Sequence, residues 1–327
     1  MTFDLIHGQE KAIGFLKRVY ERGRLPHALL FTGIDGIGKR LTAYALASLL
    51  QCAVASGSNA CGNCPACKKI ASGNHPDFFV VEASGAYIKI DQIRALRKDF
   101  ALKPFEGKCK VAIIVDAHLM RMEAANALLK ITEEPPPDSF LILTAHQVSD
   151  VLPTIASRCQ HVEFAPLPFQ LIMKKLMENK KLDNSLASAV AAYANGSMGA
   201  AIETDAEKVM EDRLYLIEKI ENLSISRLRN AFDLAAWLDE KKDDMDKSLE
   251  MLKSWIRDLV LTKMSSQGII NQDLAEKISI AAARYSISNL ASKLKIIQDA
   301  QIALTRNLNR RSTLEVMLIR MCRVDMA

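Results

Sequence analysis

The chain has 327 residues, a mass of 36.2 kDa and a formal net charge of +5, and 49% of its residues are hydrophobic. It is therefore long enough to bury a core and to divide into two or three domains. No apolar run approaches the roughly 18 residues of a membrane-spanning helix, and the first residues lack the pattern of a signal peptide, so we expect no membrane association and a cytoplasmic location. The mild positive charge permits contact with nucleic acid without requiring it.

The first half of the sequence alternates short apolar runs with amphipathic stretches. The run HALLFTG ends at a glycine and leads into a stretch of helical periodicity, and KVAIIVDAH has the pattern of a buried strand that ends in a carboxylate. This alternation predicts an α/β domain with a parallel sheet and helices on both faces. The expected strands are 27–33, 78–82, 110–118, 140–145 and 161–164, and the expected helices are 38–52, 90–104 and 122–137.

The residues after FAPLP, which ends at Pro168, show helical patterns and no convincing strand. Two polar stretches interrupt them, NGSMG at 195–199 and ENLS at 221–224. We therefore expect a small helical domain followed by a larger helical one.

The stretch GIDGIGKR nearly matches the phosphate-binding pattern G-x-x-x-x-G-K-[ST], and it lies between an expected strand and an expected helix. In such a loop, backbone N–H groups surround a phosphate at the helix N-terminus, and the lysine reaches the β- and γ-phosphates. Arg40 stands where the pattern has a hydroxyl that binds Mg²⁺. The alternative is a tight connection whose glycines only meet backbone geometry. The residues predicted to form a degenerate nucleotide site are Gly33, Gly36, Gly38, Lys39 and Arg40.

The strand VAIIVDAH places Asp116 at the carboxyl edge of the expected sheet, where phosphate-loop NTPases use an aspartate to hold Mg²⁺. In the ATPases among them a glutamate commonly follows and orients the attacking water, but this chain has Ala117 there. The guanidinium of Arg40 offers no acceptor for a metal. Two parts of a hydrolytic site are therefore missing, and a helix cap is the alternative role for Asp116.

Four of the seven cysteines form a cluster with the spacing of a metal site. Cys61, Cys64 and Cys67 follow the pattern C-x2-C-x2-C, and Cys52 precedes them. Four thiolates can close a tetrahedral site around Zn²⁺ at about 2.3 Å per bond. The alternatives are an iron–sulfur cluster, whose ferredoxin motif has a fourth nearby cysteine that is missing here, and unpaired reduced thiols. We predict structural zinc without a catalytic role, since an all-thiolate site has no open position.

The stretch SRC, at residues 157–159, comes just before the last expected strand. Without further context, the default interpretation of Arg158 is a solvated surface residue. In oligomeric ATPases an arginine in this place points at the γ-phosphate in the site of the neighbouring subunit. The residues themselves leave both interpretations open.

Six stretches occur together in the order of a known family: LPHALLFTGIDGIGK, the cysteine cluster, HPD (75–77), NALLKITEEPP (126–136), LPTIASRCQ (152–160) and NGSMGAA (195–201). Together they resemble the family of delta-prime subunits of the bacterial DNA polymerase III clamp loader. The zinc insertion followed by SRC is shared mainly with the gamma/tau subunit of the same machine. Gamma/tau is expected to have Thr or Ser, an acid, and arginine at three positions where this chain has Arg40, Ala117 and Ala200.

The resemblance implies an AAA+ protein of three domains. These are an α/β P-loop domain at 1–166 with a zinc insertion at 52–67, a helical lid at 167–206, and an all-α collar at 207–327 for oligomerisation. We expect the apolar surface of the collar around 252–261 and 314–321 to be only partly covered within one chain.

The resemblance also implies partners and roles. The partners are the gamma/tau and delta subunits, the beta sliding clamp and primed DNA. Arg158 would complete the ATP site of the adjacent gamma/tau subunit, while ATP or ADP in the loop of this chain stays an open question. The alternative is a self-sufficient AAA+ ATPase that uses Lys39 and Asp116, with Thr42 or Thr144 partly replacing the missing groups. Thr144 is where the family places a residue that senses the γ-phosphate.

Overall fold

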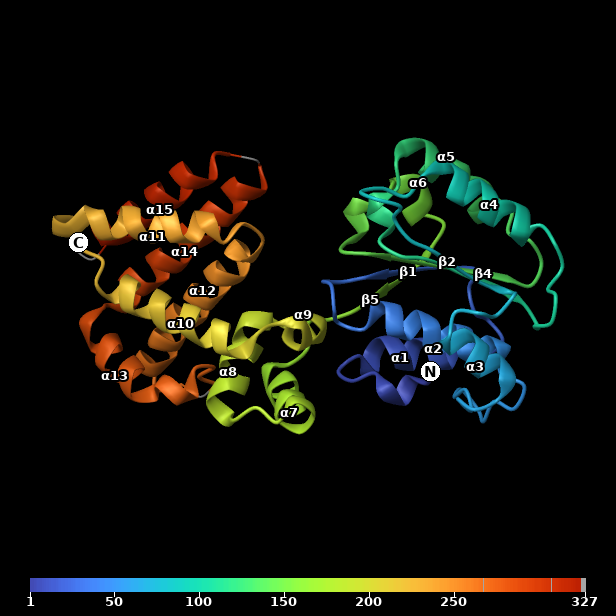
Figure 1. Cartoon of the computed structure of the whole chain (residues 1–327), viewed down its shortest axis with the longest axis horizontal. Helices are drawn as coiled ribbons and strands as arrows, with labels where there is room; N and C mark the ends of the chain where they lie inside the picture. Colours follow the sequence, from blue (N-terminus) through green and yellow to red (C-terminus); the bar gives the residue numbers. More distant parts are fainter. Residues whose placement is uncertain (267, 307, 325–327) are drawn as a thin grey trace. The chain divides into compact units, whose positions relative to one another are not determined.

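The computed structural model describes residues 1–266, 268–306 and 308–324, so Gln267, Asn307 and the last three residues of the expected collar lie outside the described residues. The chain divides into two compact units, Met1–Leu167 and Pro168–Ala327 (Figure 1). Each unit is described by itself below.

The first unit contains a five-stranded sheet of order β2-β3-β4-β1-β5, in which every pairing is parallel. The expected parallel sheet is therefore confirmed. The expected strand at 110–118 ends early, at Ile114, because Asp116 takes a left-handed conformation and the residues after it form a short 3-10 helix. The strands are β1 (Ala28–Thr32), β2 (Phe78–Val81), β3 (Lys110–Ile114), β4 (Ser139–Ala145) and β5 (Gln160–Glu163).

Helices cover both faces of this sheet, as the sequence predicted (Figure 1). Alternate residues of β1 divide between the faces: Leu29 and Phe31 pack against α1 and α2, whereas Ala28 and Leu30 pack against α4 and α5. The helices are α1 (Glu10–Glu21), α2 (Lys39–Gln51), α3 (Pro65–Ala71), α4 (Ile90–Phe100), α5 (Met122–Glu133) and α6 (Pro153–Ala156), with 3-10 turns η1 (Phe3–Leu5), η2 (Ala117–Leu119) and η3 (Val148–Asp150).

The expected helix at 90–104 ends at Phe100, and a buried carboxylate explains the loop that follows. Asp77 accepts hydrogen bonds from the backbone N–H groups of Phe105 at 2.7 Å, Glu106 at 2.9 Å and Gly107 at 2.8 Å. Burial opposes the charge of Asp77, but these three amides outweigh it and hold the pKa of the carboxyl below its ordinary value. The chain is thus drawn out of the helix before Pro104.

The second unit is helical throughout its described residues, as expected, and no strand occurs there. Its helices are α7 (Phe169–Lys180), α8 (Asn184–Ala194), α9 (Met198–Glu203), α10 (Ala206–Glu221), α11 (Leu228–Glu240), α12 (Met245–Lys263), α13 (Ala275–Arg284), α14 (Ile287–Thr305) and α15 (Arg310–Val324), with 3-10 turns η4 (Ile225–Arg227), η5 (Lys242–Asp244) and η6 (Gln272–Leu274).

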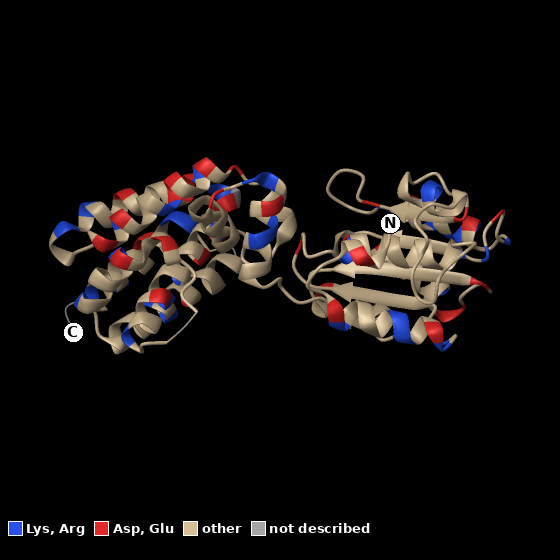
Figure 2. Cartoon of the chain, turned by 90° about the horizontal axis from the view of Figure 1, so that it is seen from below, with Lys and Arg blue, Asp and Glu red and all other residues tan. Residues whose placement is uncertain are grey.

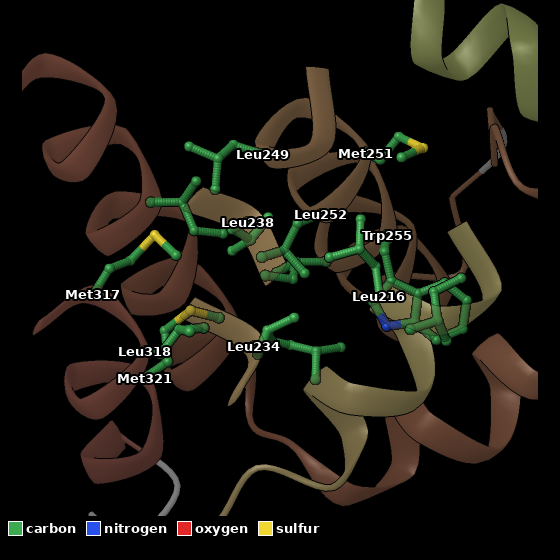
Figure 3. Close-up of a cluster of buried hydrophobic side chains, with 14 of the residues drawn as sticks. Leu216, Leu234, Leu238, Leu249, Met251, Leu252, Trp255, Met317, Leu318 and Met321 are labelled. Carbon is green, nitrogen blue, oxygen red and sulfur yellow. The ribbon is translucent and has the colours of Figure 1, made fainter. Parts of the chain in front are cut away.

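One core joins most of these helices. Figure 3 shows side chains of α10, α11, α12 and α15 converging, among them Leu216, Leu238, Trp255 and Met317. The expectation that the segments 252–261 and 314–321 are only partly covered is wrong for most of their apolar side chains, which form that core, but it holds for Val316, which is 48% exposed. The apolar residues of these two segments with 2% or less of their surface exposed are Leu252, Trp255, Ile256, Leu259, Leu314, Met317, Leu318 and Met321.

Charged residues lie mainly on the outer faces of the helices. In Figure 2 the strands carry little charge, as buried parallel strands should, and both signs mix along the helices of the second unit. Within the described residues, we find no helix with the length and apolar character needed to cross a bilayer.

Candidate functional site

The glycine-rich loop joins β1 to α2, and two of its glycines are required by geometry. Gly33 has a φ of 142°, and a Cβ there would lie 2.5 Å from the carbonyl oxygen of Phe164. Gly38, with a φ of 104°, is the residue before α2 and opens the helix N-terminus. The strand–loop–helix context predicted for these glycines is therefore present.

Lys39 is directed into this loop and is only 5% exposed. Its Nζ donates hydrogen bonds to the carbonyl oxygens of Gly33 and, at 2.8 Å, of Ile34, and lies 3.2 Å from Oδ1 of Asp35. The other carboxylate oxygen of Asp35 lies 3.3 Å from Nε2 of His146, just after β4. The ammonium group thus lies within the loop that would surround a phosphate.

Arg40 forms a small cluster with acidic and aromatic side chains. Its guanidinium is ion-paired with Glu82, just after β2, and lies 5.7 Å from the centre of the Tyr44 ring. Burial opposes the charge of Arg40, but Tyr44 and the carboxylates of Glu82 and Asp116 outweigh it and raise the pKa of the guanidinium. A positive charge fixed to the chain is therefore paired with Glu82 and interacts electrostatically with Asp116, where the sequence pattern has a hydroxyl and a metal ion.

Asp116 and two threonines complete the surroundings of the loop. Asp116 precedes η2 with a φ of 53°, but its side chain makes no capping hydrogen bond. Its backbone N–H donates to Oγ1 of Thr144 at 2.9 Å, and the hydroxyl of Thr42 donates to the carbonyl of Gly38 at 2.8 Å. Both hydroxyls considered as substitutes for the missing groups are thus engaged in hydrogen bonds, and Ala117 is 2% exposed.

The four clustered cysteines come together at the end of α2 opposite the loop. Cys52 follows α2, Cys64 precedes α3 and Cys67 lies within α3. The four Sγ atoms all lie within 4.8 Å of one another, and those of Cys52 and Cys64 are 3.9 Å apart. Tetrahedral bonds of 2.3 Å to zinc would place the sulfur atoms about 3.8 Å apart. The cluster could therefore hold one metal ion.

The surroundings of the thiols favour the thiolate form at Cys64 and oppose it at Cys67. Burial opposes the charge of Cys64, but backbone N–H groups, first that of Cys67, and the neighbouring thiols outweigh it and lower its pKa to about 6. The thiol of Cys67 is more deeply placed, and burial raises its pKa to about 12. A bound cation would remove this difference, since it stabilises thiolate at both positions.

Arg158 lies after α6 and is 38% exposed. Its backbone N–H donates to Ile155 at 3.0 Å, which continues the turn of α6. In the side chain, Nη1 donates to the carbonyl oxygen of Thr154 at 2.8 Å, and Nη2 lies 2.9 Å from Oε1 of Glu133. The next side chain, Cys159, is packed inward, and burial raises the pKa of its thiol to about 11.

Arg158 and the glycine-rich loop of its own chain lie at opposite ends of the parallel strands. Strand β5 runs parallel to β1, with Gln160 opposite Leu29, so Arg158 is level with the start of β1. Gly33 lies beyond the other end of β1. At about 3.3 Å per residue from position 27 to 33, the two are on the order of 20 Å apart, farther than one side chain reaches.

The sequence predicted the polar residues of these sites but missed their partners. The missed residues are Asp35, Tyr44, Glu82, Glu133 and His146. Asp35 and Glu133 stood inside quoted motifs, GIDGIGKR and NALLKITEEPP, but no spacing pattern connects Glu133 with Arg158. Contacts of this kind depend on the fold of the sheet, so the sequence carries no local signal for them.

The chain is similar to known proteins over most of its length. Residues 8–168 match the family model of DNA polymerase III, delta subunit, and residues 207–322 match the model of its C terminal. The chain is 31% identical over 316 residues to DNA polymerase III subunit delta' of Bacillus subtilis, with 95% of each protein covered. It is 33% identical over 317 residues to subunit delta' of Pseudomonas aeruginosa, covering 91% of this chain and 92% of the relative.

A gamma/tau relative matches over less of its own length. The chain is 28% identical over 323 residues to DNA polymerase III subunit tau of Bacillus subtilis, covering 89% of this chain and 57% of the relative. The two delta' relatives, in contrast, are matched over nearly their whole length. The resemblance noted in the sequence is thereby confirmed, and the chain belongs to the family of bacterial DNA polymerase III delta-prime subunits.

Proposed function

We propose that the chain works as the delta-prime subunit of a clamp loader, which helps to place the beta sliding clamp on primed DNA during replication. Its partners in the assembly are the gamma/tau and delta subunits, and its place is the cytoplasm. Within the assembly it hydrolyses no ATP itself and supplies Arg158 to the ATP site of a neighbouring gamma/tau subunit. The lid at 167–206 and the collar at 207–327 belong to the same proposal.

One geometric observation supports the proposal that Arg158 acts at the ATP site of a neighbouring subunit. Arg158 lies at the edge of the sheet opposite the glycine-rich loop of its own chain, so its guanidinium cannot serve that loop. It is nevertheless partly exposed, at the end of a short helix, and a neighbouring subunit can reach it. An arginine supplied in this way contributes about 10³ to 10⁵ to the rate of phosphoryl transfer where it has been measured.

The cluster around Arg40 supports the absence of hydrolysis. A guanidinium paired with Glu82 offers no oxygen ligand to Mg²⁺, and the methyl group of Ala117 cannot orient water. The loop itself, with Gly33, Gly38 and Lys39 in place, still supports weak binding of ATP or ADP.

The purified chain is therefore expected to show no ATPase activity above background, whereas its addition to gamma/tau and delta raises the clamp- and DNA-stimulated rate. The measurement is phosphate release by the chain alone and by the assembled complex, at equal ATP. A steady rate near the enzyme median of about 10 s⁻¹ from the chain alone would establish the alternative of a self-sufficient ATPase.

Zinc is the metal we propose for Cys52, Cys61, Cys64 and Cys67, because four thiolates suit its tetrahedral preference. The intact protein should contain about one zinc per chain, and Cys64→Ser should reduce this to near zero and loosen the segment between α2 and α3, since binding and local folding are coupled. Metal analysis of both proteins is the measurement. Cys322→Ser, at a buried cysteine of the second unit, is the control that should retain the metal. A Cys64→Ser protein with undiminished zinc would contradict the assignment.

A further inference from the structure

The guanidinium of Arg158 is held from two sides before any neighbour arrives. Thr154, in the turn just before it, accepts from Nη1 at 2.8 Å, and Glu133 on another helix lies 2.9 Å from Nη2. The first contact is local, while the second joins the C-terminal end of α5 to the segment that follows α6. Two contacts to different nitrogen atoms fix the plane of the guanidinium as well as its place.

The position of Glu133 is unfavourable for a carboxylate without a cation. It is the last residue of α5, where the unpaired carbonyl groups of the helix carry partial negative charge. The helix cannot extend beyond Glu133, because Glu134, which precedes Pro135, leaves the helical conformation. The carboxylate of Glu133 therefore stays at the C-terminal end of the helix. The ion pair with Arg158 compensates the charge at this fixed point.

We infer that Glu133 is a positioning residue for Arg158, an inference that rests on the proposed role of Arg158 in trans. A guanidinium has five N–H donors, so contacts at Nη1 and Nη2 leave donors for a phosphate oxygen. A long arginine side chain loses rotamer freedom when it meets a phosphate, and the contact with Glu133 removes part of that freedom beforehand. The carboxylate thereby contributes to the rate at the neighbour's site without touching the nucleotide.

Glu133→Gln tests this inference in the complex assembled with gamma/tau and delta. Glutamine keeps the size of the side chain and removes its charge. The expected result is a kcat for clamp- and DNA-stimulated ATP hydrolysis at the neighbour's site about threefold to tenfold lower, with KM for ATP unchanged. Glu134→Gln makes the same chemical change one residue later, at a carboxylate that has no ion pair with Arg158 among the described residues, and should leave kcat unchanged.

A double-mutant cycle with Arg158→Ala separates positioning from a structural role. If Glu133 acts through Arg158, Glu133→Gln should cause no further loss once Arg158 is alanine. Additive losses would overturn the inference, as would an unchanged or increased kcat in Glu133→Gln while Arg158→Ala lowers it. If Arg158→Ala itself leaves the rate unchanged, the proposed role in trans has failed, and that outcome is distinguishable from failure of the inference alone.

Discussion

Replacing Arg158 with alanine is expected to slow clamp loading and to lower the stimulated ATPase rate of the assembled complex, while the variant chain folds and assembles normally. The loss at the neighbour's site should approach the factor of about 10³ or more that such arginines contribute. The total rate falls only by the share of that site, because other sites keep their own arginines. Stability should change little, since a partly exposed ion pair contributes at most about 1 kcal/mol.

The measurement compares loading rates at saturating ATP for complexes that differ only at this residue. Arg158→Lys should not restore the rate, because an ammonium group lacks the planar, forked donors of a guanidinium. Arg94→Ala is a matched control, since Arg94 is also a surface arginine in an ion pair, at 3.5 Å from Asp91. Unchanged loading by Arg158→Ala would leave the residue a structural or solvated one.

Removal of every residue after Leu167 is expected to abolish entry into the complex with gamma/tau and delta, although the remaining unit folds. The first unit has its own cores on both faces of the sheet, so it does not need the second for its stability. The second unit has exposed apolar side chains, such as Ile302 in α14, Leu308 just before α15 and Val316 in α15, which a neighbouring subunit can cover.

The truncation is placed after residue 167 because a truncation after residue 206 would keep α8 but remove the helices that pack against its apolar face. Ala189 and Tyr193 of α8 belong to the same core as α10 and α12. Co-elution with gamma/tau and delta in size-exclusion chromatography measures assembly, and circular dichroism of the truncated protein confirms that it is folded. Assembly of the truncated chain would move the main interface to the first unit.

Local patterns determined how much of this fold was predictable. The strands were found because buried parallel strands are short apolar runs, and their residue bounds were close to those observed. Three element ends were wrong, at Ile114, Phe100 and Glu133. The first two depend on a left-handed Asp116 and on the buried Asp77, whose contacts periodicity does not encode. The third was placed too late because the expected range 122–137 included three prolines, which cannot continue a helix. The exposure of the helical half was misjudged because an amphipathic pattern shows which face is apolar but not what covers it.

The site was predictable to a similar degree. Fixed spacing identified the loop and the four cysteines, since a phosphate loop and a metal knuckle are built from neighbours in the sequence. The ion pairs of Arg40 with Glu82 and of Arg158 with Glu133 join residues on different elements. Only the assembled sheet brings these residues together.

The cluster around Arg40 also affects how this subunit can evolve. Arg40→Thr would restore the hydroxyl of a hydrolytic loop, but it would leave Glu82 without its ion-pair partner and would remove a positive charge that interacts with Asp116. Ala117→Glu would place a carboxylate at a position that is 2% exposed, at the cost of burying a charge. The first change costs little, because the side chains of Arg40 and Glu82 are 52% and 47% exposed and such pairs contribute at most about 1 kcal/mol. The buried position of Ala117 is therefore the larger obstacle, and a return to hydrolysis requires changes around residue 117 as well as at residue 40.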